Sequence, residues 1–209
     1  HISTAFKHAI HFPQLANVRT PRLLKSLTAY LKQHPKVHIY ENMWIDEFKI
    51  QQGKIQSIQA QNGQKFAADQ FVIATGAWSN HWSKQLHFQI PVEPVQGQML
   101  LFKTPENWLP TMCMNQVMYL IPRLDGHVVC GSSMNHLGFE HRPSVQTQQN
   151  IYKACTEIIP ELANFPIVKQ WAGLRPSSPR GIPYIGQMPN IDNLWANFGH
   201  YRNGLCMGP

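Results

Sequence analysis

The run from Phe71 to Thr75, which reads Phe-Val-Ile-Ala-Thr, constrains the fold of this chain more than any other feature. A short apolar run without alternating polar residues is typical of a strand that is buried on both faces. A small-residue turn, from Gly76 to Ser79, follows it at once. Because α/β folds bind ligands at the carboxyl ends of such strands, the sequence predicts an α/β layer with a ligand site at this turn.

A β-meander is predicted before that strand. Residues 45–52 and 54–61 alternate between apolar and polar side chains on either side of Gly53. Asn62-Gly63 is a strong signal for a second hairpin turn, in which both central residues take positive φ. Further upstream, Thr20-Pro21 suits the start of a helix with leucines at helical spacing over residues 20–33, and residues 37–41 predict a short strand.

Antiparallel strands with helices are predicted from about residue 92 onward. The expected strands of this region cover residues 98–103, 119–123, 127–132 and 167–174, and a last apolar strand is expected beyond it over residues 194–198. Ser144 can cap a helix, and Pro160 ends or kinks it. One face of this helix is expected to carry Val145, Ile151, Cys155, Ile158 and Leu162. We therefore predict an α+β fold, with an antiparallel-sheet domain over residues 92–180. Residues 1–91 and 181–209 are expected to form part of an α/β domain with a β-meander.

Composition excludes several classes of protein. The net charge is +7, but the 18 Lys and Arg are scattered, so nucleic acid is not the expected partner. The longest apolar stretch, Phe71 to Trp78, is far too short to cross a membrane. The four cysteines form no C-x-x-C pair and suit a reducing compartment as small apolar fillers. The 11 histidines lack metal-ligand spacing, so no metal is expected.

Two segments near the C-terminal end carry the chemistry. Residues 171–186 place Arg175 at the end of a strand and directly before a proline. The planar guanidinium can bind a carboxylate through two parallel hydrogen bonds, or it can form an internal salt bridge, and local chemistry leaves both open. Residues 198–204 lead from a strand toward a helix, where backbone N–H groups can bind an anion or a ring edge. An ordinary strand-to-helix turn is the alternative.

The two motifs A-G-L-R-P-x-S-P-x-G-x-P-Y-I-G (residues 172–186) and G-H-Y-R-N-G (residues 199–204) closely resemble those of the glycine oxidases of thiamine biosynthesis. These enzymes belong to the wider D-amino-acid oxidase and sarcosine oxidase group of flavoproteins. Residues 18–24, 72–79 and 119–123 resemble further segments of the family in the same order along the chain. The resemblance implies a substrate-binding domain over residues 92–180 and an FAD-binding domain that takes residues 1–91 and is re-entered at 181–209.

The resemblance also implies roles for individual residues. Arg175 matches the arginine that binds the substrate carboxylate, Tyr119 a tyrosine that helps to hold it, and Arg202 a second arginine on the substrate side of the flavin. Residues expected to contact or lie near FAD match in three places along the chain: Ile45, Thr75 and Gly76, and His200, Tyr201, Arg202, Asn203, Gly204, Leu205 and Cys206. Met114 stands where some glycine oxidases carry a second active-site tyrosine, which leaves the size of the substrate open.

The implied activity is FAD-dependent oxidative deamination of glycine or another small amino acid or amine, with peroxide release, in the cytoplasm. The alternatives are a D-amino-acid dehydrogenase and the flavin domain of a tRNA-modifying enzyme. The sequence begins with His1 and contains no G-x-G-x-x-G loop. We therefore expect a fragment that lacks the dinucleotide-binding loop and is inactive alone. A homo-oligomer is compatible with the sequence.

Overall fold

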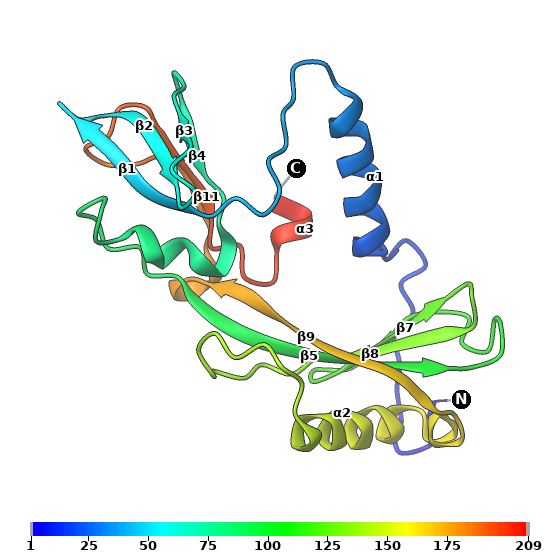
Figure 1. Ribbon diagram of the computed structural model, residues 1–209. Coiled ribbons are helices and arrows are strands. Elements are labelled where there is room, and N and C mark those ends of the chain that lie inside the picture. The colour runs from blue at the N-terminus through cyan, green and yellow to red at the C-terminus, as the bar shows by residue number, and fades with distance from the viewer. Residues whose placement is uncertain (1, 208–209) are drawn as a thin grey trace.

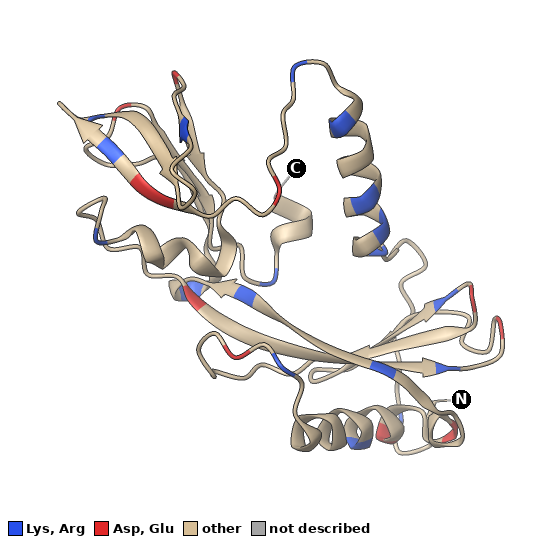
Figure 2. Cartoon of the chain, viewed as in Figure 1, with Lys and Arg blue, Asp and Glu red and all other residues tan. Residues whose placement is uncertain are grey.

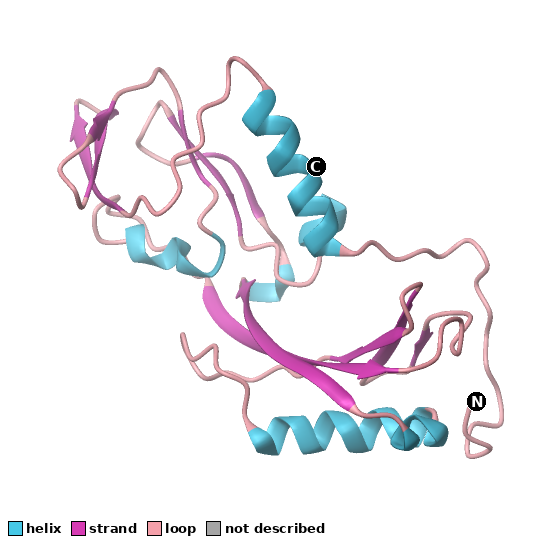
Figure 3. Ribbon diagram, turned by 45° about the vertical axis from the view of Figure 1, so that its right-hand side comes forward, coloured by secondary structure: helices cyan, strands magenta, loops and turns pink. Residues whose placement is uncertain are grey.

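A five-stranded sheet runs through the middle of the molecule in the computed structural model, which describes residues 2–207. His1, Gly208 and Pro209 lie outside the described residues. Helix α2 covers one face of this sheet, and α1, α3 and two smaller sheets lie on the other side (Figure 1, Figure 3). The predicted mixture of helices with antiparallel sheets is confirmed.

The five-stranded sheet is antiparallel throughout, in the order β6-β7-β8-β5-β9. Its strands are β5 (Glu93–Lys103), β6 (Cys113–Met114), β7 (Tyr119–Arg123), β8 (His127–Gly131) and β9 (Ile167–Ser177). The predicted β7–β8 hairpin is confirmed, but β5 begins earlier than residue 98 and β9 continues past residue 174. Pro94 and Pro176 pair with each other at the end of these two strands. Since β9 is an edge strand, the missing N–H of Pro176 does not interrupt the sheet.

Helix α2 (Val145–Ile158) packs on one face of this sheet. As predicted, Ser144 caps it by accepting a hydrogen bond from the N–H of Thr147 (3.2 Å), and Pro160 follows its end and opens the short helix η2 (Pro160–Asn164). The predicted inner face is confirmed at Ile151, Cys155, Ile158 and Leu162, but Val145 in the first turn of the helix is 66% exposed. The core between helix and sheet contains Leu100, Phe102, Leu120, Val128, Cys130, Ile151, Cys155, Ile158 and Leu162. This alternation along each strand leaves the opposite face of the sheet free to line a site.

The remaining strands form two three-stranded sheets with a core of their own. The meander consists of β1 (Ile45–Gln51), β2 (Lys54–Ala60) and β3 (Lys65–Phe66), as predicted. The second sheet has the order β10-β11-β4 and comprises β4 (Phe71–Ile73), β10 (Tyr184–Gln187) and β11 (Leu194–Phe198). The helical turns η1 (Gly76–Trp82) and η3 (Pro179–Gly181) connect these parts. Strand β4 runs parallel to β11, as an α/β layer requires.

Three local predictions are wrong. Residues 37–41 form no strand, because no other described strand pairs with them. Strand β4 is buried on one face only, since Val72 is 63% exposed. At the second hairpin only Gly63 has a positive φ (83°). The Asn62 side chain accepts a hydrogen bond from the N–H of Gln64 (3.0 Å), and the loop spans three residues instead of two.

Helix α1 (Thr20–Gln33) forms where it was predicted, although Arg19 occupies the N-cap position and makes no side-chain cap. None of its residues is buried, and the stripe of Leu24, Leu27 and Leu31 is 58%, 48% and 39% exposed. All four cysteines are free. Across residues 2–207, no helix has the length and apolarity to span a membrane, and no group of His, Cys, Asp and Glu could hold a metal ion.

Candidate functional site

Tyr119 and Arg175 lie on the same face of the five-stranded sheet, opposite α2. The strand register explains how they meet. Gly131 of β8 pairs with Met99 of β5 on one side and with Tyr119 of β7 on the other. Because Gly131 has no side chain, the Tyr119 hydroxyl reaches across it and donates to the Met99 sulfur (3.4 Å). A Cβ at position 131 would overlap that sulfur. One bare position therefore allows side chains of β7 and β5, which lie on either side of β8, to touch each other.

The guanidinium of Arg175 is held by two groups from the segment after β8. Its Nη2 donates to the Ser132 hydroxyl (2.6 Å), and its Nη1 donates to the Ser133 carbonyl (3.0 Å). Among the described residues, no carboxylate lies within salt-bridge distance of this guanidinium. Of the two roles left open by the sequence, the internal salt bridge is therefore not found. The Arg175 guanidinium therefore retains N–H donors that can bind a further anion.

The guanidinium lies against the backbone of Gly97 in β5. Gly97 and Met99 share one face of this strand because they are two residues apart. The same stretch of β5 thus supports Arg175 through Gly97 and Tyr119 through Met99. The two predicted carboxylate-binding residues therefore share one sheet face, although they are far apart in the sequence.

A cavity of about 810 Å³ extends along this face from Tyr119 and Trp171 to the start of α1. At its outer end, Asp125 accepts hydrogen bonds from Arg19 (2.9 Å) and His127 (3.0 Å). These two partners lower the pKa of Asp125 to about 2. Elsewhere, Lys and Arg are spread over the molecule, with several along α1 (Figure 2). The cavity therefore has a charged outer end and a largely apolar floor.

The predicted C-terminal run is tied to the strand that carries Arg175. The N–H of Tyr201 donates to the carbonyl of Pro176 (2.9 Å), and Ser178 donates to the carbonyl of Gly199 (2.9 Å). Gly199 has a φ of 77°, and a Cβ there would crowd Ser178 and Tyr184. Residues 202–206 are exposed and lead into the short helix α3 (Gly204–Met207). Within residues 2–207, the Arg202 side chain makes no hydrogen bond or ion pair. No polar contact therefore joins it to Tyr119 or Arg175.

Two buried polar atoms near this run lack a hydrogen-bond partner: Nε2 of His200 and Oδ1 of Asn197. Such atoms are rare in proteins because leaving a buried polar group unpaired costs about 1–3 kcal/mol. The other positions predicted to meet a cofactor lie in the neighbouring layer. Ile45 opens β1 and is half-buried, Thr75 is exposed, and Gly76 takes a φ of 56° at the start of η1.

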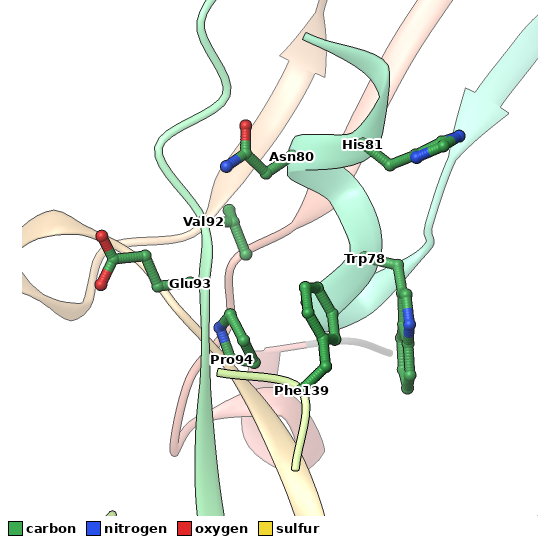
Figure 4. Close-up of a pocket in the computed structure, with 7 residues that line it drawn as sticks. All are labelled: Trp78, Asn80, His81, Val92, Glu93, Pro94 and Phe139. Carbon is green, nitrogen blue, oxygen red and sulfur yellow. The ribbon is translucent and has the colours of Figure 1, made fainter. Parts of the chain in front are cut away.

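A second, smaller cavity of about 370 Å³ opens between η1 and the start of β5 (Figure 4). Trp78 and Phe139 form one wall, with ring centroids 5.8 Å apart, and Glu93 points away on the other side. None of the predicted site residues lines this cavity.

Sequence reasoning missed the residues that hold the predicted ones in place, namely Gly97, Met99, Gly131 and Ser132. A signal existed for Gly131. An isolated glycine inside a strand often marks a close approach by another group, and Gly131 lies in the strand predicted over residues 127–132, whereas Gly97 lies just before the strand predicted over residues 98–103. For Ser132 and Met99 the sequence contains no such signal.

Comparison with known proteins gives consistent results. The model of the family described as DAO, FAD dependent oxidoreductase, matches residues 2–209. The glycine oxidase of Pseudomonas putida is 44% identical over 208 residues, which cover 100% of this chain and 57% of that protein. That of Pseudomonas aeruginosa is 40% identical over the same share of each chain. The chain spans little more than half the length of these relatives.

Solved structures agree with this comparison. The crystal structure of glycine oxidase from Geobacillus kaustophilus matches with a TM-score of 0.77 at 26% identity, and the match covers 83% of this chain and 46% of that chain. Glycine oxidase from Bacillus cereus matches with a TM-score of 0.75 at 28% identity, over 81% of this chain and 47% of that chain.

Proposed function

This chain belongs to the DAO family of FAD-dependent oxidoreductases, and we propose that the whole protein oxidatively deaminates glycine or another small amino acid or amine. The observation that carries this proposal is the position of Arg175. Its guanidinium has no carboxylate partner among residues 2–207 and lies on the same sheet face as the Tyr119 hydroxyl. A planar, charged donor on the same sheet face as a hydroxyl suits the carboxylate of an amino acid.

The residues present fit FAD. His200 Nε2 and Asn197 Oδ1 are buried polar atoms that need a partner, and both lie in or beside the run assigned to the flavin. In this proposal the backbone of residues 200–206 holds the ring system, Thr75 and Gly76 lie next to the cofactor, and the backbone of Ile45 meets the adenine end. When bound, FAD supplies the oxidising chemistry by accepting hydride from the substrate Cα, after which water hydrolyses the imine and oxygen is reduced to peroxide.

The contribution of this chain is orientation. Arg175 binds the carboxylate, Tyr119 donates a further hydrogen bond, and Arg202 lines the same side of the cofactor. Correct placement of the reacting atoms can supply roughly 7–11 kcal/mol of a reaction barrier. No residue of the chain is assigned as a general acid or base.

The names of the relatives favour glycine oxidation over the alternatives. A D-amino-acid dehydrogenase or a tRNA-modifying flavoprotein remains compatible with the family alone, whereas the relatives at 44% and 40% identity are glycine oxidases. Similarity to the bifunctional ThiO/ThiG protein of Trichormus variabilis, which is 29% identical over 203 residues, supports a place in thiamine biosynthesis. We further propose that residues 92–180 form the substrate-binding domain, residues 1–91 and 181–209 belong to the FAD-binding domain, and the enzyme is cytoplasmic.

The decisive experiment compares wild type and Arg175→Lys in the full-length flavoprotein, with peroxide release measured on glycine, sarcosine and a panel of D-amino acids. A lysine cannot make two parallel hydrogen bonds. We expect the apparent KM for the preferred amino acid to rise at least about tenfold, because a charged hydrogen bond contributes roughly 1.5–3 kcal/mol. An unchanged KM would refute the carboxylate-binding role of Arg175.

A further inference from the structure

The Arg175 guanidinium is fixed by contacts from the segment that follows β8 and from the backbone of β5. Ser132 and Ser133, in the segment after β8, each accept one hydrogen bond from a terminal nitrogen, at 2.6 Å and 3.0 Å. A guanidinium carries five N–H donors. Residues 2–207 engage two of them, which leaves three for a ligand, enough for a bidentate contact with a carboxylate.

Gly97 provides the space for this arrangement. A Cβ at position 97 would overlap Nη1, Nη2 and Cζ of Arg175. The backbone at position 97 does not take a positive φ, so glycine is required there for space and not for conformation. Directly opposite in β9, Gly173 pairs with Gly97, and a Cβ at Gly173 would meet nothing within 4 Å. Of the paired glycines Gly97 and Gly173, only Gly97 needs to lack a side chain.

We infer that Gly97 and Ser132 are positioning residues, which set the direction in which Arg175 presents its free N–H groups to the substrate carboxylate. This inference rests on the proposed function of Arg175. A long arginine side chain loses conformational freedom when it binds a ligand, and holding it in the bound orientation beforehand removes part of that cost. An added methyl group at position 97 would displace the flexible end of Arg175 and leave the strand backbone in place.

The test uses the full-length flavoprotein with glycine as the substrate. Gly97→Ala is expected to raise KM about tenfold or more, with a smaller change in kcat, because it moves the carboxylate contact and not the oxidising group. Ser132→Ala is expected to raise KM several-fold, and Ser132→Thr, which keeps a hydroxyl, should recover most of the loss. Gly173→Ala is the matched control, with KM within about twofold of wild type.

Two further measurements separate positioning from a general loss of structure. Acetate, titrated against the flavin absorbance, reports carboxylate binding without turnover, and its Kd should rise in parallel with KM in Gly97→Ala. In an Arg175→Lys background, Gly97→Ala should add less than about twofold, because residues that act through one group are not additive. The thermal midpoint of each variant shows whether it is folded.

The outcomes distinguish the positioning role of Gly97 and Ser132 from the carboxylate-binding role of Arg175. If Arg175→Lys raises KM but Gly97→Ala does not, or if the two effects multiply fully, the positioning role is overturned while the proposed function stands. If Arg175→Lys leaves both KM and the acetate Kd unchanged, the carboxylate-binding role fails, and the positioning role fails with it.

Discussion

The five-stranded sheet and the β10-β11-β4 layer differ in how much of their apolar surface is covered by other elements. The larger sheet packs one face against α2, with Leu100, Phe102 and Leu120 at 0% exposure, and carries the predicted site residues Tyr119 and Arg175 on its other face. The smaller layer also buries one face, but Val72 and Trp195 on its outer face are 63% and 41% exposed. An apolar outer face of this kind is typical of a surface that another element covers.

Helix α1, like the smaller layer, has an apolar face that is exposed. Its leucine stripe has the spacing of a helix that packs on a core, yet none of its residues is buried. Apolar periodicity therefore shows that a face is built to be covered, but does not identify what covers it. The cover of the larger sheet lies within the described residues, and we predict that the two regions respond differently to the same kind of substitution.

The largest difference is expected for truncation of buried and exposed apolar side chains. Phe102→Ala removes a side chain at 0% exposure that stacks on Tyr152, and should lower the free energy of unfolding by about 3–5 kcal/mol. Leu27→Ala, at 48% exposure, should change it by less than about 0.5 kcal/mol. Urea denaturation followed by tryptophan fluorescence measures both. Equal costs would mean that the α1 stripe is covered, and the contrast between the two regions would disappear.

A smaller effect is expected where the meander joins the β10-β11-β4 layer. Asn193, at 7% exposure, accepts a hydrogen bond from the N–H of Ile55 and donates one to its carbonyl, both at 2.9 Å. Asn193→Ala leaves two buried backbone groups without a partner and should cost about 2–3 kcal/mol. The control Asn62→Ala removes an exposed hydrogen bond to the Gln64 N–H and should cost less than about 0.5 kcal/mol. A loss at Asn193 no greater than at Asn62 would show that the two sheets are not coupled through this residue.

The smallest effect concerns the ion pair between Arg19, which precedes α1, and Asp125 in the β7–β8 hairpin. The pKa of Asp125 falls from 3.8 to about 2 in the folded protein. A lowered carboxyl pKa stabilises the fold fully above the unfolded value, and the contribution is lost as the pH falls toward 2. Because the pair is exposed, the contribution is below about 1 kcal/mol. Asp125→Asn should flatten the change in unfolding midpoint between pH 5 and pH 2, relative to wild type. An identical slope in both proteins would contradict this role.

The sequence predicted the elements whose partners are close along the chain. The β7–β8 hairpin, the Ser144 cap and the inner face of α2 all follow from local periodicity and turn chemistry. The strand at residues 37–41 was wrong because a strand needs a partner as well as suitable residues. Exposure of Val72 was missed because an apolar run does not reveal how many of its faces are covered.

The sequence predicted which residues belong to the candidate site, but not how they are arranged in space. The resemblance pointed to Arg175 and Tyr119, and their shared sheet face follows from the register of strands that are distant in sequence. The hydrogen bond from Arg175 to Ser132 joins residues 43 apart in the sequence, and the space above Gly97 exists only once β9 pairs with β5. Such contacts depend on tertiary structure, so no local pattern encodes them.

The hydrogen bond between Tyr119 and Met99 has a consequence for ligand exchange. A thioether sulfur is a weak acceptor, so the Tyr119 hydroxyl, which donates to it at 3.4 Å, gives up little when it turns to another partner. A carboxylate oxygen is a much stronger acceptor. In the proposed function, the hydroxyl would thus be kept oriented between ligands by a bond that an arriving carboxylate can replace at small enthalpic cost. Only the same weak bond re-forms when the ligand leaves, so the Met99 sulfur competes little with a bound carboxylate.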